Sequence, residues 1–270
     1  MLIWLAFLII PLSLSGAIPL TTPIIGSTTP YLKAGTRSSA AKPFPSNSNA
    51  NWFDVSSSPE FSRTGFGGTS HSTGHDVSYK GNIGIPYGSN IIEVTSSDAH
   101  HYKYVVQFQG SNTNDWVVVI WNKYSTDGVM NGWYGKACKR FTLRTGQVRY
   151  FAFNDDSQGG WAAAPGSSIP TDSTGAYAST WGEFDFGSSI NSGWSGFDVS
   201  AIVAQNAGFH VQGMEICDVL GRTCSSITSN AALVRNAYTN ENGNIGGIGG
   251  NIPAGPVRLS VTIDYGSKHD

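Results

Sequence analysis

The 270-residue chain is poor in charge: Lys, Arg, Asp and Glu make up 13% of it and the formal net charge is −2, against roughly 25% charged residues in an ordinary globular domain. This balance gives no electrostatic reason to expect nucleic acid or an anionic membrane as a partner. The 33 glycines and the 12% aromatic content, with 8 Trp, instead indicate a β-protein with many tight turns.

The chain begins with an apolar run, "MLIWLAFLIIPLSLSGA", that ends in small residues. The run is too short to span a bilayer, and its end is typical of a signal-peptide cleavage site. We therefore predict a signal peptide at residues 1–17 and a protein exported to the medium or the cell wall. Residues 18–64 are dominated by Ser, Thr, Pro, Ala and Asn and lack a periodic apolar face, which predicts a disordered Ser/Thr/Pro-rich arm.

After the arm, the pattern changes to that of strands. Alternating or continuous apolar residues predict strands at 102–109, 116–121, 148–153 and 256–265. In the last of these, Arg258 belongs to the set that should face outward. Clusters of Gly, Asn and Asp separate the strands at intervals typical of a β-sandwich.

Helical signals are few. Residues 198–208 have an acidic start, an apolar run and a final glycine, and residues 229–238 follow a Ser-Asn cap. We therefore predict an all-β fold, a single β-sandwich or jelly-roll-like domain with one or two short helices, over residues 65–270.

The chain has three cysteines: Cys138, Cys217 and Cys224. An oxidising compartment favours a disulfide between the two close ones, in "CDVLGRTC". A metal site is the alternative, although the cluster lacks the two close Cys/His pairs that zinc sites usually have. Cys138 is then left over, either buried or free.

The stretch "TWGEFDFGSS" places Trp181, Glu183 and Asp185 on one side of a predicted strand. Carboxylates two residues apart on a strand are separated by about 6.6 Å along its axis, which is within the range that glycosidases use. The Glu-x-Asp spacing resembles a strand motif of jelly-roll β-glucanases, but this chain has Gly187 and Ser188 where the motif has a further glutamate. The competing interpretation is that the two carboxylates lie on the solvated face of a half-buried strand.

Acidic residues in predicted loops raise the possibility of calcium. Asp155, Asp156 and Asp172 could supply oxygen ligands together with the strand carboxylates. Aspartates also initiate turns without any metal, and the spacing matches no calcium loop. We therefore expect no cofactor and no metal, with calcium as the alternative.

Several tryptophans are flanked by glycine and polar residues. Flat aromatic rings beside polar side chains are what carbohydrate recognition uses. The alternative is that glycine lets a tryptophan cover one end of the sandwich. We predict a carbohydrate-binding surface formed by Trp133, Trp161, Trp181 and Trp194, with Glu183, Asp185 and Asp156 as polar partners.

Long blocks of the predicted domain resemble the Asp f 4 allergen family of filamentous fungi, from about Gly65 to Gly266. They include "YVVQFQGSNT", "WNKYSTDGVMNGWYG", "FNDDSQGGW", "YASTWGEFDFGSSINSGWSGFDVSAI" and "GGIGGNIPAGPVRLSVTIDY". The resemblance implies a secreted or wall-associated protein of a type bound by IgE. It implies no reaction and no catalytic residues.

Together these features predict a non-catalytic, secreted wall protein that contacts wall polysaccharide, with β-glucan or chitin as the ligand class. The alternative is a glycoside hydrolase acting on β-glucan through Glu183 and Asp185. A third hypothesis is a purely structural or host-interaction protein, which gains ground if no glycan binds and the tryptophans are buried. The feature to examine is whether the face that carries Trp181 and these carboxylates is covered or open to a sugar.

Overall fold

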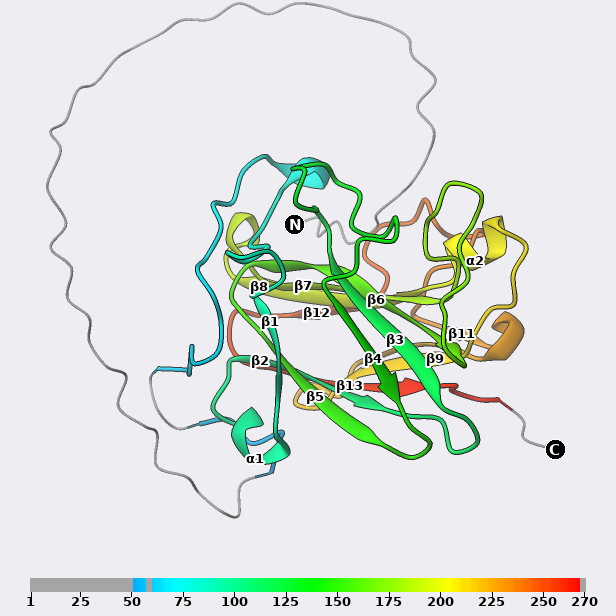
Figure 1. Ribbon diagram of the computed structural model, residues 1–270, viewed down its shortest axis with the longest axis horizontal. Coiled ribbons are helices and arrows are strands. Elements are labelled where there is room, and N and C mark those ends of the chain that lie inside the picture. Colours follow the sequence, from blue (N-terminus) through cyan, green and yellow to red (C-terminus); the bar gives the residue numbers. More distant parts are fainter. Residues whose placement is uncertain (1–50, 57–59, 268–270) are drawn as a thin grey trace, which may run out of the picture.

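The computed structural model describes residues 51–56 and 60–267. The predicted signal peptide, residues 1–17, and most of the predicted arm lie outside the described residues. The described part is mostly β, with two sheets that face each other and only short helices (Figure 1). The predicted all-β sandwich is therefore confirmed.

One sheet has six strands and is antiparallel throughout. Its order is β12 (Gly250–Ile252), β8 (Trp194–Ser200), β7 (Trp181–Ser188), β6 (Ser157–Pro165), β3 (Trp116–Asn122) and β4 (Lys139–Leu143). A register shift between Asp185 and Ser188 interrupts the pairing of β7 with β8.

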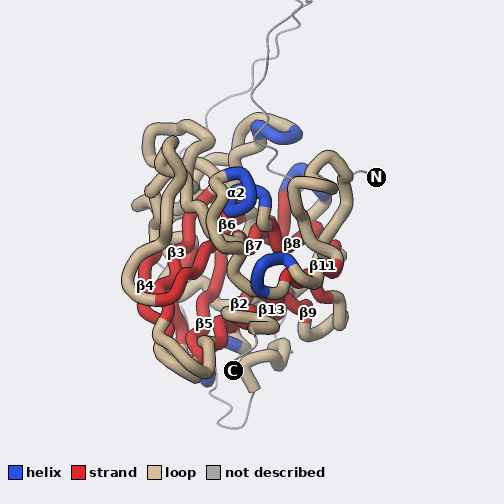
Figure 2. Tube along the Cα trace, turned by 90° about the vertical axis from the view of Figure 1, so that its right-hand side faces the viewer, coloured by secondary structure: helices blue, strands red, loops and turns tan. Residues whose placement is uncertain are grey.

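The other sheet has seven strands, of which β2 and β13 pair in parallel. Its order is β1 (Ile91–Val94), β5 (Val148–Phe153), β2 (Tyr104–Gln109), β13 (Val257–Ile263), β9 (Met214–Asp218), β10 (Cys224–Ile227) and β11 (Val234–Arg235). The helices are α1 (Ser96–Ala99), α2 (Ile202–Asn206) and the 3-10 turns η1 (Asp76–Ser78), η2 (Ser189–Asn191) and η3 (Ser229–Ala231). Figure 2 shows the strands gathered at the centre, with loops and helices around them.

The main core lies between the two sheets. Aromatic side chains from both sheets meet there: the ring of Phe153 on β5 lies 4.9 Å from that of Phe184 on β7, and Tyr104 on β2 stacks on Phe186 at 5.5 Å. These residues are the inward-facing half of their strands, because successive side chains of a strand point to opposite faces.

Each sheet also carries an apolar cluster on its outer face. On the six-stranded sheet this cluster includes Trp121, Trp133, Tyr177 and Trp181. The loop from 123 to 138 and the loop from 166 to 180 cover it, and they are joined to each other: Tyr177 N–H donates to the carbonyl of Trp133 (3.0 Å), and Ala137 N–H donates to the Tyr177 hydroxyl (3.3 Å). The outer face of this sheet is therefore covered by two loops that are hydrogen-bonded to each other.

The structure corrects both helix predictions in part. The segment from 198 to 200 is the end of β8, and only Ile202–Asn206 is helical; the segment from 229 to 238 forms η3 and β11. Asp198 and Val199 pair with Glu183 and Gly182 of β7, so strand pairing with a neighbour overrides the local helical pattern.

Arg258 lies on the outer face of the seven-stranded sheet, as predicted, because it pairs with Val105 of the outer cluster and its neighbours Val257 and Leu259 face the core, but this face is covered there and not solvated. Its side chain is 0% exposed, and its guanidinium donates to the carbonyls of Lys103 (2.9 Å), Val257 (2.9 Å) and Asp54 (3.1 Å). Buried cations need such partners. Through its bond to the Asp54 carbonyl, Arg258 also holds the segment around Asp54 on the seven-stranded sheet.

The predicted arm also ends earlier than residue 64. Trp52 packs against Tyr150, with ring centroids 5.7 Å apart, and Ser62 N–H donates to the carbonyl of His101 at 2.8 Å. Polar composition hides these contacts, because a few aromatic and backbone interactions suffice to hold an otherwise hydrophilic segment on a sheet.

Candidate functional site

Four residues form a row across the outer face of the six-stranded sheet. Trp121 on β3 pairs with Gly160 on β6, Gly160 pairs with Glu183 on β7, and Glu183 pairs with Asp198 on β8. Residues in direct antiparallel register share a face, with Cβ atoms about 4.5–5.5 Å apart. The row therefore sets two carboxylates side by side next to a tryptophan.

Gly160 makes the row possible. A Cβ at this position would lie 2.7 Å from the Trp121 indole, so the indole occupies the space above the glycine. Trp121 in turn contacts Trp181, with ring centroids 5.1 Å apart. Aromatic rings therefore lie on two sides of the carboxylates: Trp121 above Gly160 of β6, and Trp181 two residues before Glu183 on β7.

A second row of polar side chains runs parallel to the first. Lys123 N–H donates to the carbonyl of Gln158 (2.8 Å), and Gln158 pairs with Asp185. Burial lowers the pKa of Lys123 to about 8, and the negative charges of Asp185 and Glu183 oppose this shift. The two rows together bring one lysine and three carboxylates onto one face, which we call the outer-face cluster: Lys123, Glu183, Asp185 and Asp198.

Glu183 and Asp198 are both withdrawn from solvent, with exposed fractions of 5% and 0%. Neither carboxyl oxygen of Asp198 has a hydrogen-bond partner among the described residues. Burial, with repulsion from Glu183, raises the pKa of Asp198 well above its usual range. Two adjacent buried carboxyls cannot both ionise without a large cost, so burial and the Glu183 charge favour the protonated form of Asp198.

Asp185 is perturbed in the same direction. Burial, and to a lesser degree the charge of Asp156, raises the pKa of Asp185 to about 7. Strongly shifted carboxyls are often found at functional sites, although structural networks shift them as well. The outer-face cluster therefore holds two groups, Asp185 and Lys123, whose pKa values of about 7 and about 8 let them take up and release a proton near neutral pH. The cluster lies beside the aromatic rings of Trp121 and Trp181.

The chain between 236 and 252 closes the Asp198 side of the cluster. Tyr238 is bound to β8 through its N–H to Val199 O (2.8 Å) and its carbonyl to Ala201 N–H (2.9 Å), and β12 follows at Gly250. Residues 239–248, which connect Tyr238 to β12, leave the sheet and form a loop that we call the edge loop. Asn236 holds the neck of this loop by two bonds to the backbone of Gly249, each 2.9 Å.

Gly249 has to be a glycine at this point. Its φ is +104°, and a Cβ would lie 2.7 Å from the Cβ of Asp198. The backbone therefore passes directly against the acid pair, and the Tyr238 side chain, whose pKa is raised to about 12 by burial and the Asp198 charge, covers the same region. The cluster is covered in this structure.

Of the predicted site residues, Trp181, Glu183 and Asp185 do share one face. The expectation that this face is solvated is wrong, since Trp181 is 3% exposed and Glu183 5%. The residue that the sequence reasoning missed is Asp198. The hairpin formed by β7 and β8 could have indicated Asp198 as the cross-strand partner of Glu183. The register shift between Asp185 and Ser188 prevents this, because residues of the two strands can then not be paired by counting outward from the turn.

The predicted tryptophans divide into three environments. Trp161 is 0% exposed and lies in the core between the sheets, 5.2 Å from Phe108 and stacked on Phe184 at 5.5 Å. Its prediction as a surface residue is wrong. Trp133 and Trp181 are buried in the outer cluster of the six-stranded sheet, at 5% and 3% exposed, so their prediction as surface residues is wrong as well. Trp194 is half-buried at the start of β8.

The neighbouring glycines misled the prediction for a physical reason. Gly182 pairs with Trp161 across β6 and β7, and a Cβ at Gly182 would lie 2.2 Å from the Trp161 indole nitrogen. A glycine beside a tryptophan thus marks the space that the ring fills within a sheet, and not the exposure of that ring.

The loop aspartates proposed for calcium accept hydrogen bonds from the protein itself. Asp156 is buried and accepts from the Tyr79 hydroxyl (2.7 Å), from Ser189 N–H (2.9 Å) and from the Ser72 hydroxyl. Asp155 pairs with Lys103 at 2.7 Å. Asp172 accepts from the N–H groups of Thr174 and Ala176, as in a turn. The expectation of no metal, with calcium as its alternative, stays a prediction.

The disulfide prediction is confirmed: Cys217 and Cys224 are bonded. Cys138 is free, and burial raises the pKa of its thiol to about 11. Within residues 51–56 and 60–267, no helix is long and apolar enough to cross a membrane.

Comparison with known proteins places the chain in a family. The model of the Allergen Asp f 4-like domain matches residues 89–263. Allergen Asp f 4 of Aspergillus fumigatus is 48% identical over 217 residues, covering 80% of this chain and 67% of that protein. Among solved structures, the protein elicitor MoHrip2 from Magnaporthe oryzae matches with a TM-score of 0.38 and 11% identity, over 60% of this chain and 99% of that one. The chain therefore belongs to the family of proteins with an Allergen Asp f 4-like domain.

Proposed function

We propose that this chain is a secreted, wall-associated protein that binds a neutral wall polysaccharide, β-glucan or chitin, on the loop-covered side of the six-stranded sheet. The Cys217–Cys224 disulfide supports an oxidising, extracellular location. IgE recognition is the part of the proposal that comes from the family alone.

One observation carries the polysaccharide proposal: an aromatic stack that starts on the sheet and ends at the surface. Trp181 on β7 lies 6.1 Å from Trp133, and Trp133 lies 5.5 Å from Tyr134, which is half-buried. Tyr134 is held by its N–H to the carbonyl of Asn131 (3.1 Å). A half-buried aromatic ring beside polar groups suits a sugar ring.

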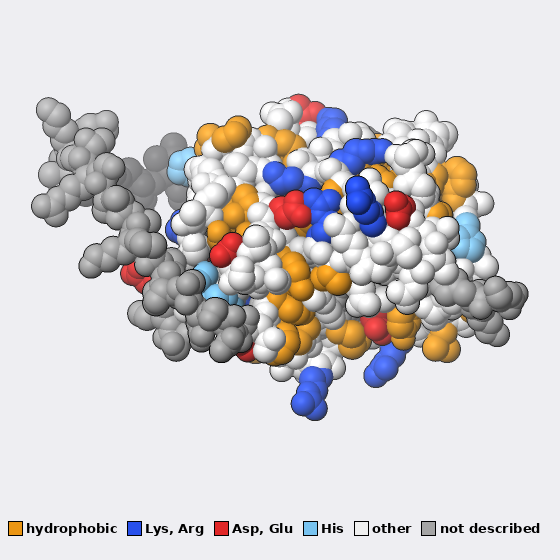
Figure 3. Space-filling view, turned by 60° about the horizontal axis from the view of Figure 1, so that its bottom comes forward, with side chains coloured by type: hydrophobic (Ala, Val, Ile, Leu, Met, Phe, Trp, Pro, Cys, Tyr) orange, Lys and Arg blue, Asp and Glu red, His pale blue; other side chains and the backbone are white. Residues whose placement is uncertain are grey.

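Polar side chains surround the end of this stack. Asp127 accepts from Lys136 (2.6 Å), from the Ser125 hydroxyl (2.6 Å) and from the side-chain amide of Asn131 (3.2 Å). Such a hydrogen-bonded set on a loop fixed to a rigid sheet is typical of recognition surfaces. Asp127 and Lys136 give these surroundings both signs of charge, so a neutral ligand fits better than a polyanion. Figure 3 shows basic and acidic side chains beside one another on the face that it draws.

Pull-down on insoluble β-glucan and on chitin tests the proposal. The variant Tyr134→Ala/Trp194→Ala removes two half-buried rings from this side, and we expect its retention to fall about tenfold or more, since each aromatic contact contributes roughly 1 kcal/mol. Tyr150→Ala is the matched control, because Tyr150 is a half-buried ring on the seven-stranded sheet. Equal retention of wild type and both variants, or no retention of wild type, contradicts the proposal.

A glycoside hydrolase is the second candidate, and Asp198 is the observation that favours it. Glu183 and Asp198 are direct cross-strand neighbours, so their Cβ atoms are expected roughly 4.5–5.5 Å apart, a spacing that lets the carboxyls adopt the about 5–5.5 Å separation of retaining enzymes. The raised pKa of Asp198 favours its protonated form beside a second carboxyl group, and an acid kept protonated by its surroundings is what a general acid requires. Because the pair is covered, access of a sugar would require the edge loop to move.

Product release from a panel of β-glucans tests this second candidate. Glu183→Gln and Asp198→Asn preserve shape and imitate the protonated acids, so both variants should fold. If the pair is catalytic, each should lower turnover at least about a hundredfold, whereas Asp115→Asn, an exposed aspartate elsewhere, should leave it unchanged. Absence of product with wild type, or turnover that survives both changes, rules out the assignment.

A further inference from the structure

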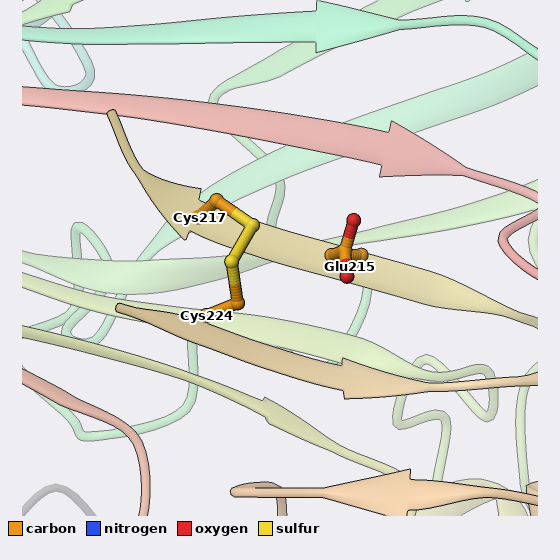
Figure 4. Close-up of side chains that lie close together, drawn as sticks. All are labelled: Glu215, Cys217 and Cys224. Carbon is orange, nitrogen blue, oxygen red and sulfur yellow. A yellow bond between two sulfur atoms is a disulfide. The ribbon is translucent and has the colours of Figure 1, made fainter. Parts of the chain in front are cut away.

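The outer face of the seven-stranded sheet holds a second cluster of chemically reactive side chains. Glu215 and Cys217 are two residues apart on β9, and Cys224 lies opposite Cys217 on β10. The carboxylate and the two sulfurs lie within 4.8 Å of one another, and all three residues are half-buried (Figure 4). Met214 and Ile216, the chain neighbours of Glu215, face the core, so Glu215 and the two cysteines point to the solvent side.

We propose that the Cys217–Cys224 disulfide masks a binding site for a thiophilic divalent metal such as Zn²⁺, which Glu215 completes once the disulfide is reduced. A dithiol donates two electrons to the S–S bond and becomes a disulfide itself, while the two cysteines gain two protons and become thiols. Binding of the metal then displaces both thiol protons. Two thiolates, one carboxylate and a water molecule together supply four ligands of the types that bind zinc.

The geometry suits a metal because the ligands are already together. Zinc–sulfur bonds are about 2.3 Å and zinc–oxygen bonds about 2.0–2.2 Å, so ligand atoms around one ion lie roughly 3.5–4 Å apart. The present separations of up to 4.8 Å require only side-chain rotation. While the sulfurs are bonded to each other they offer no thiolate, so the oxidised protein should not bind.

The scaffold does not depend on the disulfide for its register. Backbone bonds close the hairpin beyond it: Asp218 N–H donates to Thr223 O (2.8 Å), and Arg222 N–H donates to Asp218 O (2.7 Å). Strand β9 is also paired along its other edge with β13. Since reduction breaks none of these bonds, the two thiols should stay opposed across β9 and β10.

Glu215 is also held in place from outside the cysteine pair. It lies opposite Ser226 on β10 and Thr262 on β13, and its charge and hydrogen bond raise the pKa of Tyr265. Removal of its charge therefore leaves a shape-equivalent amide among the same neighbours, which separates the ligand role of Glu215 from any role in folding.

Titration with Co²⁺ as a spectroscopic probe tests the inference. The protein is reduced with a phosphine, freed of reductant without oxygen, and titrated with CoCl₂, with Zn²⁺ displacing the cobalt afterwards. We expect one Co²⁺ per reduced chain, with thiolate-to-cobalt charge-transfer and tetrahedral d–d bands, and none with the oxidised chain. Glu215→Gln should weaken binding about tenfold or more, and Cys138→Ser should bind as wild type does.

Three results overturn the proposal: no cobalt bands in the reduced chain, equal affinity of Glu215→Gln, or loss of binding in Cys138→Ser. Circular dichroism of the reduced protein and of Cys217→Ser/Cys224→Ser shows whether the sheet survives without the disulfide. Loss of the β signal in both also overturns it, because the argument requires an intact hairpin.

Discussion

At the scale of single residues, the outer-face cluster is where the protein keeps ionisable groups out of water. Burial raises the pKa of Asp185 to about 7 and of Asp198 well above its usual range, and it lowers the pKa of Lys123 to about 8. Each shift opposes the charged form, as expected when desolvation exceeds the attraction between neighbouring charges. The cluster therefore costs stability at neutral pH.

These shifts predict the sign of the pH dependence of stability. Between the ordinary aspartate pKa of 3.8 and about 7, the folded chain retains a proton on Asp185 that the unfolded chain has lost. The free energy of unfolding should therefore fall as pH rises through this window, by up to roughly 1.4 kcal/mol per pH unit for each such proton. Above pH 8, Lys123 reverses the sign, since the folded chain releases its proton before the unfolded chain does.

Denaturant unfolding from pH 4 to pH 10 measures this dependence. The double variant Asp185→Asn/Asp198→Asn should flatten the fall between pH 4 and 7, because neither amide ionises. Asp115→Asn, in an exposed loop, should keep the wild-type profile. An equally steep fall in the double variant would assign the pH dependence to other groups.

At the scale of elements, strand β6 shows how glycine and tryptophan share space in this sheet. Trp161 on β6 lies over Gly182 on β7, and Trp121 on β3 lies over Gly160 on β6. One pair faces the core and the other faces the outer cluster. The sheet thus accommodates two indoles, one on each face, only because a side chain is missing at the position beside each ring.

The glycine positions can be tested one at a time. In Gly182→Ala the new methyl carbon would lie 2.2 Å from the Trp161 indole nitrogen, so the ring or the strand must shift, and we expect a loss of roughly 2 kcal/mol or more in the free energy of unfolding. Gly246→Ala, where nothing lies within 4 Å of the added carbon, is the control and should be near neutral. Urea denaturation and near-ultraviolet circular dichroism report the two effects, and equal stability of the two variants would refute this view of β6.

At the scale of the whole molecule, the fold depends on strands that are distant in sequence. Strand β13, near the end of the chain, lies between β2 and β9 in the seven-stranded sheet and runs parallel to β2. Its inward side chains, Val257, Leu259, Val261 and Ile263, belong to the core between the sheets. The sandwich cannot be completed before this strand is in place.

Truncation tests this dependence. A chain ending at Gly255 lacks β13 and leaves the edges of β2 and β9 unpaired, so we expect it to lose cooperative thermal unfolding and to aggregate. A chain ending at Gly266 retains β13 and should unfold cooperatively as the full chain does. Cooperative unfolding of the shorter chain would show that the remaining strands form a core without β13.

Local pattern determined much of this protein. The continuous apolar run predicted β3, the run from 148 to 153 is β5 itself, and the close cysteines form the expected disulfide. The long sequence blocks identified the family that the comparisons confirm. These features were readable because strand periodicity, short loops and contiguous similarity are properties of neighbouring residues.

Tertiary structure decided what those residues face. Periodicity placed Trp181, Glu183 and Asp185 on one side of a strand, but only the sheet showed that this side is covered and that Asp198 stands opposite Glu183. It also showed Trp161 and Arg258 to be buried. Alternation tells which side chains point together, whereas burial depends on segments far away in the sequence, and a shifted register between two strands leaves no trace in either one.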